Sequence, residues 1–331
     1  MSLFDLEEDS LLSEIEKRKA KKLLIQLPDG LKPLAVAFSH KIEEKTGILT
    51  FISADPCYGG CDLAIDEAKS LGVDLILHVG HTGFVNSDVP TLYLEAKAFI
   101  DTTDITERSK ELLQKASRVG IATTIQHVDT LEAIGRVLEA SGIKTVIPPK
   151  STRTKYGGQI IGRDYESLKT ILNQIDAYLI VGSVFHAIGA ALTVNKPVVC
   201  ADPYSNRVLT MEDLKKKILK QRFAFIDRAT RAKEFGIIIG AKLGQFNLAL
   251  AAKLRHKLRE RGRNVSLLCL REITPEHLAD FTDIEVFIST ACPRVAIDDP
   301  ERFGKPILTA RETLVVTGET SWEKLIEEGL L

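Results

Sequence analysis

Short runs rich in Val, Ile and Leu alternate with longer amphipathic segments along the 331-residue chain. Runs such as residues 237–239 lack the apolar–polar alternation of a half-exposed strand, so they predict strands that are covered on both faces of parallel sheets. The amphipathic segments at residues 131–140 and 248–261 predict helices, since Gly142 and Gly262 follow them closely as stop signals. The alternation of strands and helices predicts an α/β fold.

The pattern also repeats three times, with a period of about 105 residues, which is the length of a whole domain and not of a solenoid unit. An apolar strand introduced by an acidic residue marks each repeat, and these acids are Asp74, Asp176 and Asp283. An earlier strand, followed by a turn and a helix, occurs at residues 22–27, 118–122 and 235–240. We therefore predict three homologous small parallel-sheet α/β domains in a pseudo-threefold triangular arrangement.

The repeat suggests where one domain gives way to the next. We expect a first domain at residues 1–107, a second domain with a helical connector at 108–232, and a third domain at 233–331. The connector, residues 211–231, is rich in lysines, which we expect on a solvated helix face.

Composition narrows the class of protein. Apolar residues make up 44% of the chain, charged residues 27%, and the net charge is −1, as in an ordinary globular protein. This near-neutral charge argues against direct nucleic-acid binding, and no apolar run is long enough to span a membrane. Because residues 1–13 are acidic and not signal-like, we expect a cytoplasmic protein whose five cysteines stay reduced.

The most informative segment is residues 54–62, Ala-Asp-Pro-Cys-Tyr-Gly-Gly-Cys-Asp, after the predicted strand at 48–52. Cys57 thus lies at the carboxyl end of a strand, where open α/β sheets bind ligands. Two thiols in a glycine-containing turn indicate a metal or redox site, although two small buried apolar residues are the alternative.

The remaining cysteines divide by position. Cys292 follows the acid-led strand of the third repeat, so a triangle of domains would let it meet Cys57. Cys269 lies within the apolar run 265–270 and is predicted to be a core residue. Cys200 ends a strand and has no clear assignment.

Six motifs of the chain resemble those of the diphthamide synthase family, the 2-(3-amino-3-carboxypropyl)histidine synthases of archaea with their related eukaryotic subunits. The motifs are residues 27–30, 54–62, 78–81, 158–162, 202–205 and 290–294. The resemblance implies three related domains that each give one cysteine to a 4Fe–4S cluster. It also implies cleavage of the Cγ–S bond of S-adenosylmethionine. The 3-amino-3-carboxypropyl radical then attacks an imidazole carbon of a histidine in translation elongation factor 2.

The resemblance assigns Cys57 and Cys292 to the first and third cluster ligands, but Arg163 stands where the family has the middle cysteine. A guanidinium stays protonated and offers only donors, so it cannot replace a thiolate. Cys61 or Cys200 would have to complete the set. One of the two eukaryotic subunits also lacks the middle cysteine and supports its partner. We therefore favour a heterodimer with a homologous three-cysteine subunit and an electron donor; a self-sufficient homodimer is the alternative.

For the substrate carboxylate, Arg294 is the leading candidate, and a structural ion pair with Asp298 or Asp299 is its alternative role. Further candidates for contact with S-adenosylmethionine lie in strand-end loops: Asp29, Gly30, Ser183, His186 and Gln245. Two other functions stay open. A quinolinate synthase-like cluster enzyme would share the three-domain build, but the motif at 54–62 argues against it. A cluster-free scaffold protein of the same fold would explain the missing ligand.

Overall fold

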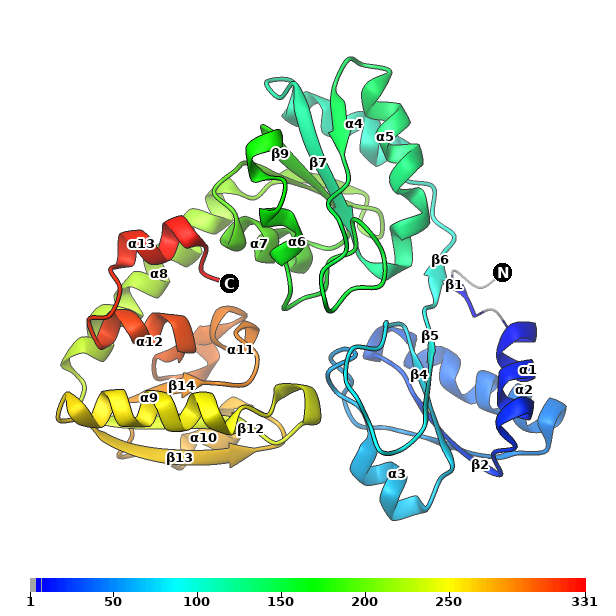
Figure 1. The fold of residues 1–331 in the computed structure, drawn as a ribbon, viewed down its shortest axis with the longest axis horizontal. Helices are drawn as coiled ribbons and strands as arrows, with labels where there is room; N and C mark the ends of the chain where they lie inside the picture. Colours follow the sequence, from blue (N-terminus) through cyan, green and yellow to red (C-terminus); the bar gives the residue numbers. More distant parts are fainter. Residues whose placement is uncertain (1–3, 7) are drawn as a thin grey trace.

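The computed structural model describes residues 4–6 and 8–331, which fold around three separate β-sheets at the corners of a triangle (Figure 1). The first sheet has the strand order β3 (Leu49–Ile52), β2 (Lys22–Gln26), β4 (Leu75–Val79), β5 (Thr91–Leu94). The second has the order β11 (Arg207–Thr210), β10 (Val198–Asp202), β9 (Ala177–Val181), β7 (Arg118–Thr123), β8 (Lys144–Val146). The third has the order β13 (Asn264–Leu270), β12 (Glu234–Gly240), β14 (Val286–Ser289), β15 (Ile307–Thr309).

All three sheets share one topology, in which the first strand lies between the second and the third, and the fourth strand follows the third. Every pairing in this shared set is parallel, and only β11 adds an antiparallel edge. A short ribbon of β1 (Phe4–Asp5) and β6 (Lys97–Ala98) lies between the first two sheets. The predicted fold class, homologous parallel-sheet domains in a triangle, is confirmed; the residue boundaries of the domains stay a prediction.

Helices cover both faces of each sheet, which is why the strands read as continuous apolar runs. In the first domain, Leu23 and Ile25 pack in one core cluster while Leu24, between them, packs in another on the opposite face. The helices of the first two domains are α1 (Glu8–Arg18), α2 (Ala35–Thr46), α3 (Ile65–Leu71), α4 (Thr103–Leu113), α5 (Leu131–Glu139), α6 (Glu166–Lys169) and α7 (Val184–Thr193). The others are α8 (Glu212–Arg231), α9 (Leu248–Glu260), α10 (Pro275–Ala279), α11 (Arg294–Ile297), α12 (Ala310–Val316) and α13 (Trp322–Glu328).

In each repeat an acidic side chain accepts hydrogen bonds from the backbone at the start of the first strand. Asp74 accepts hydrogen bonds from two backbone N–H groups at the start of β2, at 2.8 and 2.9 Å, and Asp176 does the same for β7. In the third domain this residue is Glu285 and not Asp283, so the alignment of the third repeat on Asp283 was two residues out of register. These bonds to the charged form lower the pKa of both Asp74 and Glu285.

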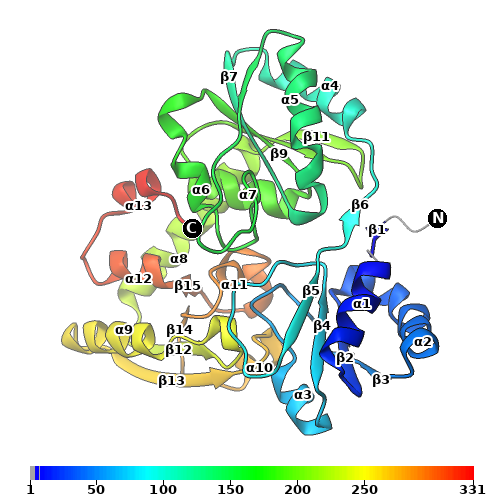
Figure 2. The same cartoon turned by 45° about the vertical axis from the view of Figure 1, so that its right-hand side comes forward.

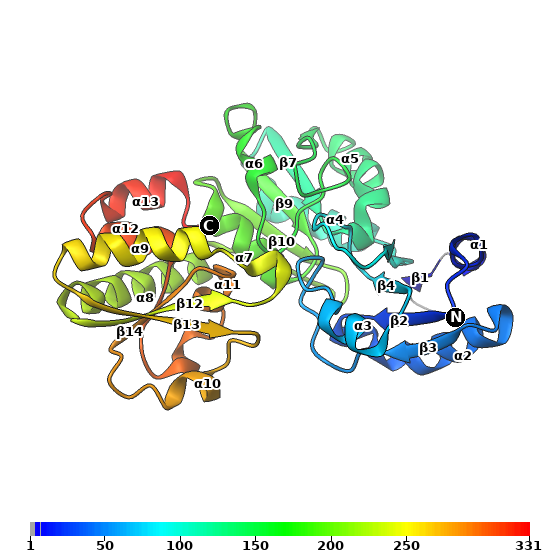
Figure 3. The ribbon, with the colours of Figure 1, turned by 60° about the horizontal axis from the view of Figure 1, so that its bottom comes forward.

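The connector forms α8, which crosses from the second sheet to the third (Figure 2). The third and first sheets lie at opposite ends of the molecule in Figure 3, with the second between and above them. None of the helices in residues 4–6 and 8–331 is long and apolar enough to cross a membrane. The prediction that Cys269 is a core residue is wrong: β13 is an edge strand, and Cys269 is exposed on it.

Candidate functional site

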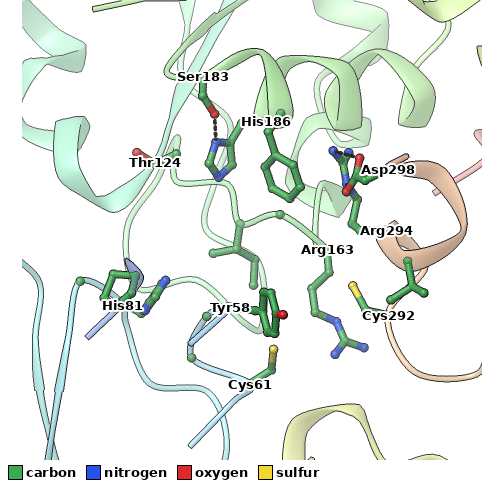
Figure 4. A pocket seen from close by; sticks show the side chains of 18 of the residues that line it. Tyr58, Cys61, His81, Thr124, Arg163, Ser183, His186, Cys292, Arg294 and Asp298 are labelled. Atoms are coloured by element: carbon green, nitrogen blue, oxygen red, sulfur yellow. Dashed lines mark hydrogen bonds and ion pairs between the residues drawn. The ribbon is translucent and has the colours of Figure 1, made fainter. Parts of the chain in front are cut away.

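A cavity of about 980 Å³ lies where the three domains meet (Figure 4). Its walls come from loops at the carboxyl ends of the first three strands of each sheet, the edge at which parallel sheets bind ligands. Residues that represent these nine loops are Gly30, Cys61, His81, Thr124, Arg163, Ser183, Lys242, Glu272 and Cys292. The repeat therefore directs three equivalent sets of loops at one centre.

Two thiols, those of Cys61 and Cys292, face this cavity from the first and third domains. The position of Cys61 is fixed by the third domain, since the N–H of Gly244 donates to the Cys61 carbonyl at 3.0 Å. The contact is so close that a Cβ on Gly244 would lie 2.5 Å from the Cβ of Cys61. Only glycine leaves room for this approach.

Arg163 reaches the same place from the second domain, and its guanidinium extends toward the two thiols (Figure 4). Its Nη1 donates to the Gly244 carbonyl at 2.6 Å. Burial raises the pKa of Cys292, and the positive charge of Arg163 is one of the influences that oppose this rise. No third cysteine lines the cavity among the residues that the structure describes.

Cys57 is not part of this lining. Its buried thiol lies with His78 and His81, and the ligand atoms of the three residues are within 4.8 Å of one another. Burial, with the nearby Asp62 carboxylate, raises the pKa of the Cys57 thiol to about 12. Cys200 is also remote from the cavity lining, because it is fully buried in β10, where its thiol donates to a backbone carbonyl at 3.4 Å.

Arg294 forms the ion pair with Asp298 that the sequence gave as one of its two roles. Its Nε and Nη2 donate to Asp298 at 2.9 and 2.8 Å, and its guanidinium stacks on Phe185 at 3.9 Å from the ring centre. Its Nη1 is buried without a hydrogen-bond partner among the described residues. This nitrogen lies against α7, since a Cβ on Gly189 would be 2.8 Å from it. Buried donors are normally satisfied, so this N–H is an exception.

The other predicted contact residues separate into two groups. Gly30, Ser183, His186 and Gln245 line the cavity, and Ser183 Oγ lies 3.0 Å from His186 Nδ1. Burial lowers the pKa of His186 to about 3, so its imidazole is neutral at physiological pH. Asp29 does not face the cavity, since its side chain is 68% exposed and pairs with a lysine one helical turn away.

The sequence reasoning missed Lys242, which is buried in the cavity wall. Its Nζ lies 2.7 Å from Asp62 and 2.5 Å from Glu272, and 4.5 Å from the ring centre of Tyr58. Burial opposes the charge, but the hydrogen bonds and attraction of the two carboxylates together raise the pKa of Lys242. This ion pair joins the first and third domains, and its only sequence signal was its place directly after β12.

The fold and site define a three-domain α/β protein whose central cavity is lined by thiols from two different domains. The chain belongs to the diphthamide synthesis protein family, which matches residues 27–326. It is 31% identical to the 2-(3-amino-3-carboxypropyl)histidine synthase of Pyrococcus horikoshii over 96% of this chain and 91% of that one. It is 32% identical to subunit 1 of the Kluyveromyces lactis synthase, over 95% of this chain and 76% of the subunit.

Solved structures agree with the sequence comparison. The crystal structure of Dph2 from Pyrococcus horikoshii with a 4Fe–4S cluster superimposes with a TM-score of 0.89 at 30% identity, covering 97% of this chain and 93% of that one. The resemblance drawn from the six motifs is therefore confirmed at the level of the family.

Proposed function

We propose that this chain acts in the first step of diphthamide synthesis, in the cytoplasm. In this step the 3-amino-3-carboxypropyl group of S-adenosylmethionine is transferred to a histidine of translation elongation factor 2. The chain is similar to a named synthase over 91% of that synthase's length and to a solved Dph2 structure over 93% of its chain. Both similarities support this assignment. The observation that carries it is that Cys61 and Cys292, from separate domains, line one cavity together with the cationic side chain of Arg294.

We assign Cys61 and Cys292 as the residues that would hold a 4Fe–4S cluster, with Cys61 in the place that the sequence gave to Cys57. Thiolates are the donors that cluster iron prefers, and both sulfurs face the cavity. When bound, the cluster would supply the electron for radical cleavage of S-adenosylmethionine. These residues supply only part of the donor set of a cluster, because Arg163 stands in the place of the third cysteine and cannot bind iron.

The remaining residues would bind and orient the substrate. The guanidinium of Arg294 would donate to the methionine carboxylate, while Asp298 and Phe185 hold it in place. The neutral imidazole of His186 and the side-chain amide of Gln245 line the same cavity and offer uncharged hydrogen-bonding groups.

We further propose that the chain works as the supporting subunit of a heterodimer. A site with two thiolates and an arginine carries more positive charge than a three-thiolate site, which would weaken its hold on the cluster. The names of the yeast relatives, which are subunit 1 of a synthase, support an assembly of more than one chain. A homologous three-cysteine subunit would then cleave S-adenosylmethionine, with electrons from a separate donor.

The ligand assignment is tested by anaerobic reconstitution with iron and sulfide. We expect Cys61→Ser and Cys292→Ser each to lose most of the bound iron and visible absorbance. Cys57→Ser is the matched control from the same loop and should retain the visible absorbance of the cluster. Loss of this absorbance in Cys57→Ser alone, or unchanged spectra in all three variants, would contradict the assignment.

The division of labour is tested in a reaction with dithionite, S-adenosylmethionine and elongation factor 2. We expect this chain alone to leave the histidine unmodified and a mixture with a three-cysteine homologue to modify it. Full modification by this chain alone would refute the supporting role and favour a self-sufficient homodimer.

A further inference from the structure

Cys57, His78 and His81 form a second group of soft donor atoms, separate from the two thiols that line the cavity. Their ligand atoms lie within 4.8 Å of one another, and His78 Nε2 is 3.0 Å from His81 Nδ1. Cys57 and His78 are buried and His81 is partly buried. The proposed function uses none of these three side chains.

The hydrogen bonds around Gln26 fix the tautomer of His78. Gln26 Nε2 donates at 2.7 Å to the carbonyl of Asp62, which can only accept, so the other end of the amide is the oxygen. That oxygen accepts from the N–H of Ala64 at 3.1 Å and lies 2.9 Å from His78 Nδ1. Nδ1 must therefore carry the hydrogen in the neutral ring. The lone pair of His78 Nε2 is left to face His81.

This arrangement is the one that metal-binding histidines need, because a ligating imidazole donates its other N–H to an oxygen that orients the ring. Two imidazole nitrogens bound to one tetrahedral zinc ion at about 2.0–2.1 Å lie about 3.3–3.4 Å apart, so the pair at 3.0 Å would have to open by only about 0.3–0.4 Å. A thiolate with two imidazoles is a donor set typical of Zn²⁺ and similar ions.

We propose that Cys57, His78 and His81 form a mononuclear site for a divalent transition metal of the Zn²⁺ class, with a fourth position left for water. His81 lies in the cavity wall, so the cavity provides a route for the ion. The site does not depend on the proposed function, since it shares no ligand with the cavity thiols.

The loop that carries His81 is already held in position. The side-chain amide of Gln126 donates to the Gly80 carbonyl at 2.8 Å, and that of Gln159 donates to Thr82 Oγ1 at 3.0 Å. Both clamps come from the second domain and flank His81 on either side. A metal would therefore find two placed imidazoles. Its binding would release the proton of the Cys57 thiol and shift the hydrogen of His81 from Nδ1, which donates to His78 Nε2, to Nε2.

The test uses the full chain with Cys61→Ser and Cys292→Ser, so that the cavity thiols cannot contribute. The protein is stripped with a chelator and titrated anaerobically with Co²⁺. We expect one Co²⁺ per chain, with a thiolate-to-cobalt charge-transfer band and the ligand-field bands of a four-coordinate ion, and displacement by Zn²⁺. Adding Cys57→Ser should abolish the charge-transfer band, whereas the control Cys269→Ser, at an exposed thiol, should leave it unchanged.

Two further variants separate a metal site from a simple hydrogen bond between the histidines. Gln26→Leu removes the orienting oxygen and should weaken Co²⁺ binding about 10–100-fold, as changes around metal ligands do. His256→Gln, at an exposed histidine, should have no effect. Absence of the thiolate band, or its survival in Cys57→Ser with native circular dichroism, would overturn the proposal. Because the iron test monitors Cys61 and Cys292, failure here leaves the proposed function standing.

Discussion

A buried ion pair between Arg222 of α8 and Glu312 of α12 holds α11, a helix that contributes to the cavity wall. Both side chains are fully buried, and the guanidinium donates to the two carboxylate oxygens at 2.7 and 2.6 Å. It also donates to the carbonyl of Ala296 at 2.5 Å and to that of Ile307 at 2.7 Å. Ala296 belongs to α11, the helix that begins at Arg294 beside Cys292.

Replacing Arg222 with Met keeps much of the apolar volume but leaves a buried carboxylate and two buried carbonyls without this donor. Breaking a buried pair by removing one partner typically costs about 3–5 kcal/mol, because the remaining charge is uncompensated. A domain is stable by only about 5–15 kcal/mol, so the loss is a large fraction of the total. We expect Arg222→Met to destabilise the third domain by roughly this amount.

Urea unfolding followed by tryptophan fluorescence measures the effect, because the only tryptophan, Trp322, lies 5.5 Å from the ring of Phe223 on α8. Arg231→Met is the matched control, since Arg231 is on the same helix but pairs with Asp227 at the surface. It should change the free energy of unfolding by less than about 1 kcal/mol. Equal effects of the two substitutions would refute the reasoning.

Two further predictions concern a buried histidine and a domain contact. Burial lowers the pKa of His127 to about 4, so between pH 6.5 and 4 the unfolded chain binds the extra proton and stability falls as the pH falls. We expect His127→Phe to lose less stability than the unmodified chain between pH 7 and pH 5 in urea unfolding; an equal loss would contradict this origin. Gly244→Ala should clash with Cys61 and lower the iron content after reconstitution, whereas Gly30→Ala, with open space at its Cβ, should not. Equal iron contents would show that the close contact is dispensable.

The fold could be predicted because its signals are local and occur three times. Fully apolar strands, helix stop signals and acids that introduce strands recur with one period, and each repeat supports the interpretation of the other two. The anchor in the third repeat shows the limit of this reasoning. Asp283 and Glu285 both precede β14, and only the backbone that each meets in space decides which one pins β12.

The choice between the thiols of Cys57 and Cys61 could not be made from the sequence. Both lie in a loop without helix or strand, so no period tells which side chain faces the cavity. Cys61 faces the cavity because the backbone of Gly244, which is far along the chain, packs directly on it. Lys242 was missed for the same reason, since its partner Asp62 belongs to another domain.

Arg163 shows how a change of one ligand changes what holds the domains together. At a site with three thiolates, one from each domain, the metal itself would join the triangle. Here the second domain is joined by the hydrogen bond of Arg163 to the Gly244 carbonyl, and Gly244 in turn rests on Cys61. One residue from each domain thus meets at this corner through hydrogen bonds between protein groups. An arginine at this position therefore lets the protein itself join the domains, which agrees with the proposed supporting role.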